Sequence, residues 1–250
     1  MSALPSAASA TAAILVIGNE ILSGKVTDLN SPFLCKELRA LGVSLRRIEV
    51  VPDEIDVIAE AVARLSQTYD HVFTSGGIGP THDDKTIEAV AQAFEAAVEQ
   101  SPLLVELLER WYGDTLNEAR LRMALVPAGA EIAHGGDVKI PVVFARNVMI
   151  LPGVPELFRK AFRPLRERFL CHPYHCRRAY VTVMEGDIAD LLTRIERDHE
   201  SVDVGSYPVF EADSPYRVML TFDSKSADAA QAALNAFLSG VPAAGVYKVE

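Results

Sequence analysis

Residues 74–84 read T-S-G-G-I-G-P-T-H-D-D and follow the apolar run His71-Val72-Phe73. The apolar run predicts the end of a buried strand, and three glycines within four positions predict a tight turn after it. Glycine has no Cβ, so backbone N–H groups in such a turn can approach a ligand closely, usually a phosphate. Because Asp83 and Asp84 would repel phosphate, the stretch also predicts a divalent cation between the carboxylates and the ligand.

The composition limits the class of protein to which this turn can belong. The chain has 250 residues, 49% of them apolar, which is enough for one large core or two unequal ones. A net charge of -10 argues against a nucleic-acid-binding surface, which needs a basic stripe. Three cysteines suit a reducing compartment better than a disulfide framework, so we expect a cytoplasmic protein.

Two further expectations concern the start of the chain and the membrane. No apolar run approaches the roughly 18 residues of a membrane span, so we expect no contact with a membrane. Residues 1–11 lack the basic start of a signal peptide, and we expect a disordered tail there.

Short apolar runs alternate with longer amphipathic ones in the first half of the chain. This alternation predicts a parallel, doubly wound sheet, in which ligands bind beyond the carboxyl ends of the strands. We expect strands over residues 13–17, 43–50 and 70–74, and helices over residues 32–41, 54–67 and 86–97.

Four polar or glycine-bearing junctions follow strand-like runs, at residues 18–20, 51–54, 75–80 and 151–155. Each alone is also explained by an ordinary turn, since turns use the same residue types. Strand ends of a parallel sheet share one edge, however, so we expect all four junctions to meet there.

The order of these motifs identifies a resemblance. Residues 12–169 resemble the molybdopterin-binding-like fold family in the segments I-G-N-E-I-L-S-G-K-V-T-D-L-N, V-V-P-D-E, T-S-G-G-I-G-P-T-H-D-D-K-T and L-P-G-V-P-E-L. The G-G-x-G-P-T-x-D-D stretch resembles the branch of the competence/damage-inducible protein CinA and of FAD synthases. The resemblance implies a three-layer α/β/α domain with a mostly parallel sheet over residues 12–170.

The resemblance also implies roles for individual residues. It implies catalytic roles for Asp53 and Asp84, which with Asp83 would hold Mg²⁺ or another divalent cation. The alternative for these carboxylates is helix N-capping. For Asp28 and Asn30, capping of the helix that follows them and ligand contact are equally open. The implied ligand contacts are Gly18, Glu20, Asp28, Asn30, Ser75, Gly76, Gly77, Gly79, Thr81, Thr86, Gly153 and Pro155.

The pattern changes after the first domain. Cys171-His172-Pro173-Tyr174-His175-Cys176 contains zinc-ligand types, but four ligands within six residues reach a tetrahedral geometry with difficulty. We therefore expect residues 171–178 to be a linker. Residues 179–250 show the order β-α-β-β-α-β, which predicts a small α+β ferredoxin-like domain.

Three functions remain open at this level. The CinA-like and FAD-synthase-like motif implies a metal-dependent nucleotide pyrophosphatase that hydrolyses ADP-ribose or FAD. The alternatives are a molybdopterin-binding protein or adenylyltransferase of molybdenum cofactor biosynthesis, with molybdopterin as ligand, and a non-catalytic nucleotide or pterin binding module. Relatives are often homo-oligomers, and Trp111 with the apolar positions of residues 103–108 is the expected interface.

Overall fold

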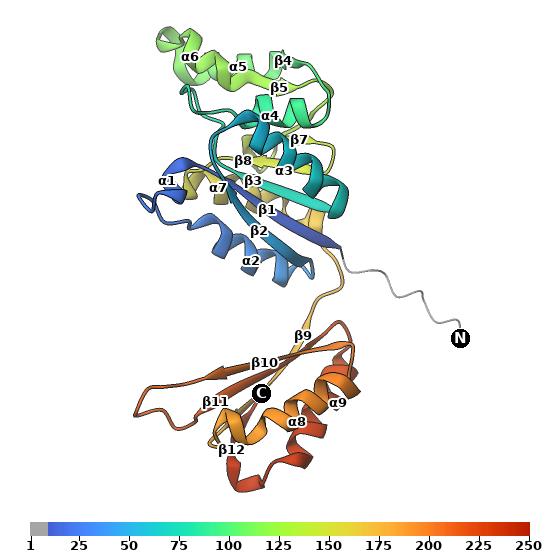
Figure 1. Cartoon of the computed structure of the whole chain (residues 1–250). Helices are drawn as coiled ribbons and strands as arrows, with labels where there is room; N and C mark the ends of the chain where they lie inside the picture. Colours follow the sequence, from blue (N-terminus) through green and yellow to red (C-terminus); the bar gives the residue numbers. More distant parts are fainter. Residues whose placement is uncertain (1–9) are drawn as a thin grey trace, which may run out of the picture. The chain divides into compact units, whose positions relative to one another are not determined.

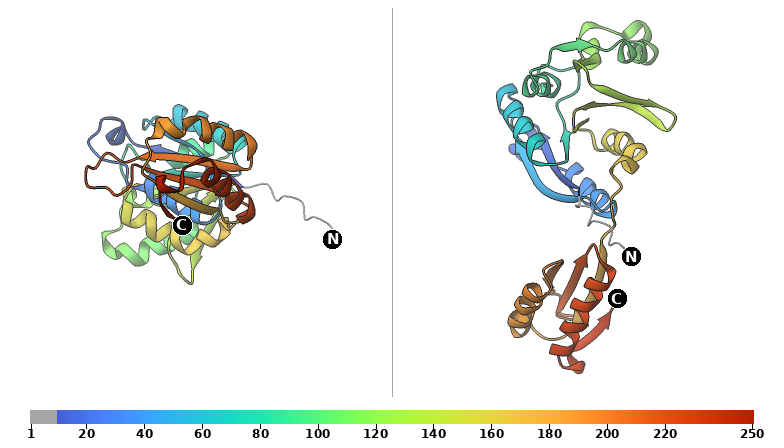
Figure 2. Two further views of the ribbon diagram at one scale, coloured as in Figure 1. Left: turned by 90° about the horizontal axis from the view of Figure 1, so that it is seen from below. Right: turned by 90° about the vertical axis from the view of Figure 1, so that its right-hand side faces the viewer.

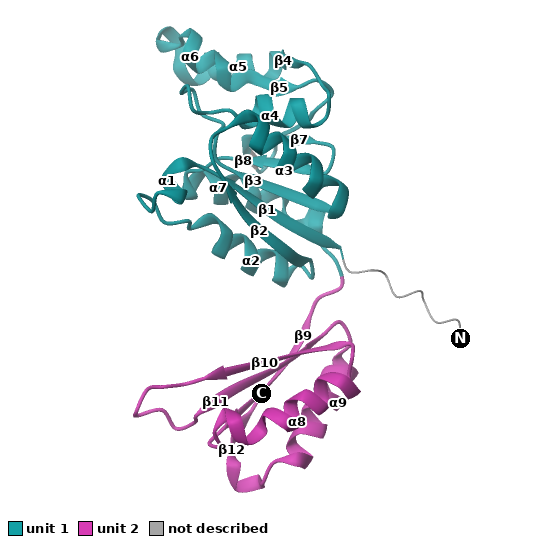
Figure 3. Cartoon of the chain, viewed as in Figure 1, with its two compact units in different colours: residues 1–171 teal, residues 172–250 magenta. Residues whose placement is uncertain are grey.

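The computed structural model describes residues 10–250 and divides the chain into two compact units, residues 1–171 and 172–250 (Figure 3). Most of the expected tail, residues 1–9, lies outside the described residues. Thr11 already belongs to the first strand, where it pairs with Ser44, and its backbone N–H and hydroxyl both donate to Oδ2 of Asp70 at 2.7 Å. The predicted tail therefore extended too far at its inner end.

A six-stranded sheet in the order β2-β1-β3-β8-β7-β6 forms the centre of the first unit (Figure 1). The first four strands of this order are parallel, and β7 and β6 continue the sheet with antiparallel pairing. The prediction of a mostly parallel sheet is confirmed. The strands are β1 (Thr11–Ile17), β2 (Ser44–Val51), β3 (His71–Ser75), β6 (Glu131–Gly135), β7 (Val138–Ala145) and β8 (Val148–Leu151).

Helices cover both faces of this sheet, which gives the predicted three layers (Figure 2). Alternate residues of β1 pack on opposite sides: Leu15 joins one core and Ile14 the other, and neither is exposed to solvent. Such double burial explains why β1 appears in the sequence as a continuous apolar run. The helices are α3 (Ile55–Thr68) and α4 (Thr86–Ala93) on one face, and α2 (Asn30–Ala40) and α7 (Pro155–Phe162) on the other.

The predicted helix over residues 86–97 is too long at its C-terminal end. It stops at Ala93, and Glu95 adopts a left-handed conformation with a φ of 53°, which a helix cannot continue through. The chain then forms a short antiparallel pair, whose strands enclose a helical segment. These elements are β4 (Val98–Gln100), α5 (Pro102–Tyr112), η1 (Gly113–Thr115), α6 (Glu118–Leu121), η2 (Arg122–Ala124) and β5 (Leu125–Pro127).

Helix α5 corrects the expected oligomer interface. Leu104, Leu107 and Leu108 are buried within the unit's own core, because their spacing places them on one face of the helix. Trp111 remains 53% exposed. The leucines are therefore core residues, and the oligomeric state stays a prediction.

The second unit has the β-α-β-β-α-β order that the sequence predicts. Its sheet runs β10-β11-β9-β12 with antiparallel pairs throughout. The predicted linker over residues 171–178 is too long, because β9 begins at His175, which pairs with Ser224. The elements are β9 (His175–Val181), α8 (Glu185–Asp198), β10 (Val202–Pro208), β11 (Val218–Ser224), α9 (Ala227–Gly240), η4 (Ala243–Gly245) and β12 (Val246–Val249). Within residues 10–250, no helix has the length and apolar character that crossing a membrane requires.

Candidate functional site

The four polar junctions meet at the carboxyl edge of the parallel strands, as predicted. The backbone N–H of Gly18 donates to the carbonyl of Val51 at 3.2 Å, which joins the first two junctions. The N–H of Gly76 donates to the carbonyl of Leu151 at 3.1 Å, which joins the third to the fourth. The convergence follows from topology, since β2, β1, β3 and β8 are neighbours that point the same way.

Asn30, the first residue of α2, connects two of the loops at this edge of the sheet. Its side-chain NH₂ donates to Ser75 Oγ at 2.9 Å and to the carbonyl of Gly153 at 2.8 Å. The residue is only 4% exposed. Helix capping falls instead to Asp28, whose Oδ1 accepts from the N–H groups of Asn30 and Ser31 at 2.9 and 3.0 Å. Asp28 therefore caps the helix, whereas Asn30 connects two loops, and ligand contact by either residue stays a prediction.

The turn of residues 75–79, here called the glycine turn, depends on glycine for steric reasons. Gly77 has a φ of 68°, and a Cβ there would lie 2.3 Å from Oγ1 of Thr86. Thr86 is fully buried, and its hydroxyl donates to the carbonyl of Gly76 at 2.8 Å. The backbone N–H of Thr86 in turn donates to the carbonyl of Gly77 at 2.9 Å. Thr86 therefore holds the glycine turn from the first residue of α4 rather than facing a ligand.

Asp84 and Asp53 each accept a backbone N–H with one oxygen. Oδ2 of Asp84 accepts from the N–H of Thr81 at 2.8 Å and from its hydroxyl at 2.5 Å. Oδ2 of Asp53 accepts from the N–H of Asn19 at 2.8 Å. Neither side chain caps the helix that follows it, α3 or α4, but Asp53 accepts the first N–H of the short helix α1 (Asn19–Leu22). The other oxygen of each carboxylate makes no hydrogen bond to the described residues.

Lys85 and Asp83 flank Asp84 and behave differently. The Nζ of Lys85 donates to the carbonyl of Asp53 at 2.9 Å, so this lysine ties the third junction to the second. The Asp83 side chain is 60% exposed, and hydrogen bonding to the Thr81 side chain and its own backbone lowers the pKa of its carboxyl. Among the residues that the structure describes, no three acidic, histidine or cysteine side chains are placed to hold a metal together. Asp53, Asp83 and Asp84 are therefore not gathered as one set of three ligands, because Asp83 faces solvent.

Two cavities, each of about 80 Å³, flank the glycine turn. The first, the α4 pocket, is lined by Gly77, Gly79 and Asp84 among the predicted residues. The second, the α2 pocket, is lined by Glu20, Asp28, Asn30, Ser75, Gly153 and Pro155 among the predicted residues. The remaining predicted residues, Gly18, Asp53, Gly76, Thr81, Asp83 and Thr86, line neither cavity and lie in or beside the junctions. The predicted ligand set thus divides between two hollows, with the glycine turn passing from one to the other.

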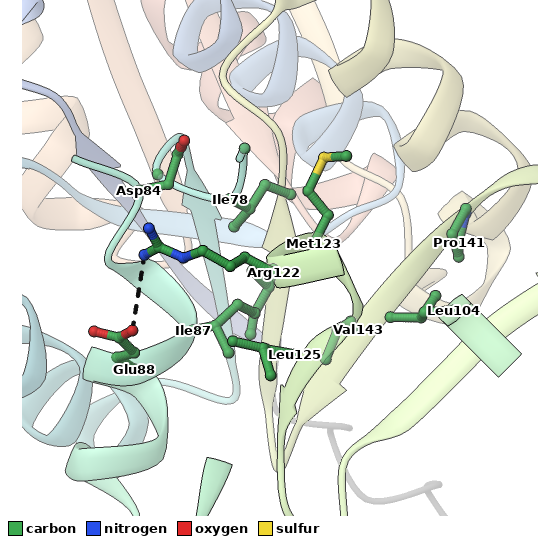
Figure 4. A pocket seen from close by; sticks show the side chains of 13 residues that line it. Ile78, Asp84, Ile87, Glu88, Leu104, Arg122, Met123, Leu125, Pro141 and Val143 are labelled. Atoms are coloured by element: carbon green, nitrogen blue, oxygen red, sulfur yellow. Dashed lines mark ion pairs between the residues drawn. The ribbon is translucent and has the colours of Figure 1, made fainter. Parts of the chain in front are cut away.

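The α4 pocket contains residues that the sequence analysis missed. Its walls are largely apolar and include Ile78, Ile87, Met123 and Val143. Figure 4 shows the guanidinium of Arg122 between the carboxylates of Asp84 and Glu88, with the ion pair to Glu88 at 3.9 Å. Arg122 lies in η2, far along the chain from the glycine turn, and its local sequence carries no recognisable motif.

Comparison with known protein families places this geometry in context. Residues 13–172 match the family described as "probable molybdopterin binding domain". The chain belongs to the probable molybdopterin-binding domain family. Residues 173–250 match a second family, described as "FAD synthase, middle domain", so both units have recognised relatives.

Individual relatives of this molybdopterin-binding-domain chain agree with the resemblance seen in the sequence. An Archaeoglobus fulgidus protein is 34% identical over 224 residues, which cover 90% of this chain and 95% of the relative. A probable FAD synthase of Caenorhabditis elegans is 36% identical over 89% of this chain, and the chain spans about half of that protein's length, 48%. The crystal structure of CinA from Thermoplasma acidophilum, a protein of unknown function, has a TM-score of 0.59 at 29% identity, and the match covers 64% of this chain and 99% of that protein. The predicted resemblance to CinA and FAD synthases is thereby confirmed.

Proposed function

We propose that the first unit is a metal-dependent nucleotide pyrophosphatase that hydrolyses ADP-ribose or FAD. The observation that carries the proposal is the position of the glycine turn between two pockets. A dinucleotide has the matching form: two bulky ends joined by a pyrophosphate. With the pyrophosphate on the backbone N–H groups of the glycine turn, each end of the substrate faces one pocket.

The proposed reaction is the transfer of one phosphoryl group of the substrate to water. A water oxygen forms a bond to one phosphorus, the bridging P–O bond breaks, and two phosphate monoesters leave. Catalysis of this kind rests mainly on positioning and on stabilising charge. The glycine turn would orient the pyrophosphate, and Asp53 and Asp84 would orient the water and accept its proton.

The donors present suit a hard divalent cation shared with the substrate. Asp53 and Asp84 each offer one oxygen that no described residue hydrogen-bonds, and Lys85 links their two loops. Mg²⁺ is commonly bound by one or two carboxylates plus substrate phosphates, so a cage of three protein ligands is not required. Such an ion would neutralise charge on the phosphate oxygens.

Binding of molybdopterin is the second candidate, favoured by the description of the family itself. A pterin with a single phosphate would use the glycine turn and one pocket, and no hydrolysis would follow. The non-catalytic binding module makes the same prediction for nucleotides. Both alternatives differ from the proposal in product formation, which a hydrolysis assay measures.

The test incubates the protein with ADP-ribose or FAD and with Mg²⁺, Mn²⁺ or Co²⁺, and quantifies released AMP by chromatography. We expect AMP only when a divalent cation is present. Asp84→Asn should lower the rate by roughly a hundredfold or more, because the amide can still accept from Thr81 but lacks the charge.

Asp83→Asn is the matched control, since it removes the same charge from the neighbouring, solvent-facing side chain. We expect it to retain most of the parental rate. Equal rates for Asp84→Asn and the parental protein would contradict the catalytic role of Asp84. If no AMP forms with any of the metals, the pyrophosphatase is contradicted and the two binding functions remain as candidates.

A further inference from the structure

Arg122 is the one cationic side chain among the described residues that line the two pockets. Both pockets otherwise carry carboxylates: Asp84 and Glu88 in the α4 pocket, and Glu20 and Asp28 in the α2 pocket. The Nζ of Lys85, the nearest alternative in sequence, is already bonded to the carbonyl of Asp53. An anionic ligand at the glycine turn therefore has Arg122 as its one cationic partner within the pocket walls.

The guanidinium of Arg122 is also poorly partnered within the protein. Its contact with Glu88 is 3.9 Å long, beyond the range of a hydrogen bond, and no hydrogen bond joins its side chain to another described residue. Arg64 shows the contrast, because its Nη2 lies 2.7 and 2.9 Å from the two oxygens of Glu49. A guanidinium has five N–H donors, so those of Arg122 are available to a ligand.

The position of Arg122 relates these donors to the glycine turn. The side chain is 40% exposed, and its guanidinium lies between Asp84 and Glu88 in the pocket that Gly77, Ile78 and Gly79 also line (Figure 4). An anion on the backbone of this turn therefore enters the hollow that the guanidinium faces. Glu88 holds the guanidinium there by a weak, half-exposed ion pair, which is worth little and is easily exchanged.

We infer that Arg122 binds a phosphate oxygen of the nucleotide held at the glycine turn and exchanges Glu88 for it. The inference rests on the proposed function for the location of the phosphate. The planar fork of arginine suits phosphate, since two parallel N–H groups can bond two of its oxygens. Arg122 thereby favours ligands with phosphate beside the α4 pocket over uncharged ligands of the same shape, and Glu88 acts as its internal competitor.

The test measures ADP and adenosine binding by calorimetry, with no turnover required. Arg122→Gln should weaken ADP binding by roughly tenfold to a hundredfold, as expected for loss of a charged hydrogen-bonding group, and should leave adenosine binding unchanged. Glu88→Gln should tighten ADP binding by up to about fivefold, because the guanidinium loses its competitor. That gain should shrink in the double variant, since no guanidinium remains to be released.

Arg110→Gln is the matched control, because Arg110 pairs with Glu106 on the neighbouring helix α5 and does not line either pocket. Unchanged ADP affinity in Arg122→Gln would overturn the inference. Equal losses of ADP and adenosine binding would also overturn it, since they would show that Arg122 only shapes the pocket. A parental protein that binds neither ADP nor inorganic pyrophosphate would contradict it as well.

The inference and the proposed function can fail separately. If Arg122→Gln weakens ADP binding but no dinucleotide is hydrolysed, the phosphate contact stands and the pyrophosphatase is excluded. If hydrolysis occurs with the same KM in Arg122→Gln and the parental protein, the pyrophosphatase stands and the phosphate contact of Arg122 is excluded.

Discussion

At the scale of single residues, Asn30 shows how one buried amide joins two of the four junctions. Its NH₂ group connects Ser75 at the end of β3 to Gly153 after β8 from within a buried position. Asn30→Leu keeps the approximate volume and removes both donors. Ser75 Oγ is buried and would lose its donor, which costs about 1–3 kcal/mol, so the free energy of unfolding in urea should fall by about that amount.

Asn235→Leu provides the comparison, because this amide lies on the exposed side of α9 and accepts one bond from Gln231 at 3.1 Å. We expect its unfolding free energy to stay within about 0.5 kcal/mol of the parental value. If the two variants lose the same stability, the buried amide does not hold the junctions together.

Residue roles were predictable from the sequence only where the chemistry is local. Glycines followed by aspartates mark a turn whatever surrounds them, so the glycine turn was found and the four junctions were expected to meet. For Asp28 and Asn30 the sequence left capping and ligand contact equally open, because it does not show that the Asn30 amide is bonded to the loops of Ser75 and Gly153. Arg122 was missed because it reaches the site only through the path of the chain between β4 and β5.

At the scale of elements, the glycine turn and α4 are locked together, and Gly77 shows why. Gly77 and Gly24 have nearly the same φ, 68° and 72°, but a Cβ at Gly77 meets the buried Thr86 hydroxyl whereas a Cβ at Gly24 meets nothing within 4 Å. Gly24→Ala should therefore cost only the conformational strain of about 1–2 kcal/mol. Gly77→Ala should cost a further 1–3 kcal/mol or so from overpacking, measured by urea unfolding of both variants. Equal losses would mean that Thr86 moves away without cost.

The shortest elements of the first unit gave no signal in the sequence. The three strands and three helices expected in the first half of the chain showed an apolar period, and their predicted bounds lie within a few residues of those observed. No bounds were predicted for the later elements α5, β6, β7 and α7 of the first unit, although each has five or more residues. The elements β4, β5, α6 and η2 have three or four residues each, too few for a period to appear. These short elements carry part of the wall of the α4 pocket, so the pocket could not be foreseen although the turn beside it could.

At the scale of the whole molecule, the chain contains two units with separate hydrophobic cores. Phe237 of α9 is fully buried in the second unit and lies 5.7 Å from the ring of Phe222, centroid to centroid. Phe162 of α7 is fully buried in the first unit, where its ring stacks on Phe169. Replacement of either by alanine removes a large buried side chain and leaves a cavity, which typically costs about 3–5 kcal/mol.

The cores of the first unit share no residues with the core of the second unit, so each replacement should weaken only the unit that contains it. Hydrogen exchange followed by mass spectrometry reports the opening of each segment separately. In Phe237→Ala we expect faster exchange in peptides from β9 to β12, with β1 to β3 exchanging at the parental rate. In Phe162→Ala we expect the reverse pattern. If either replacement accelerates exchange equally in both units, the units unfold as one cooperative body, and the glycine-turn site depends on the second unit for its stability.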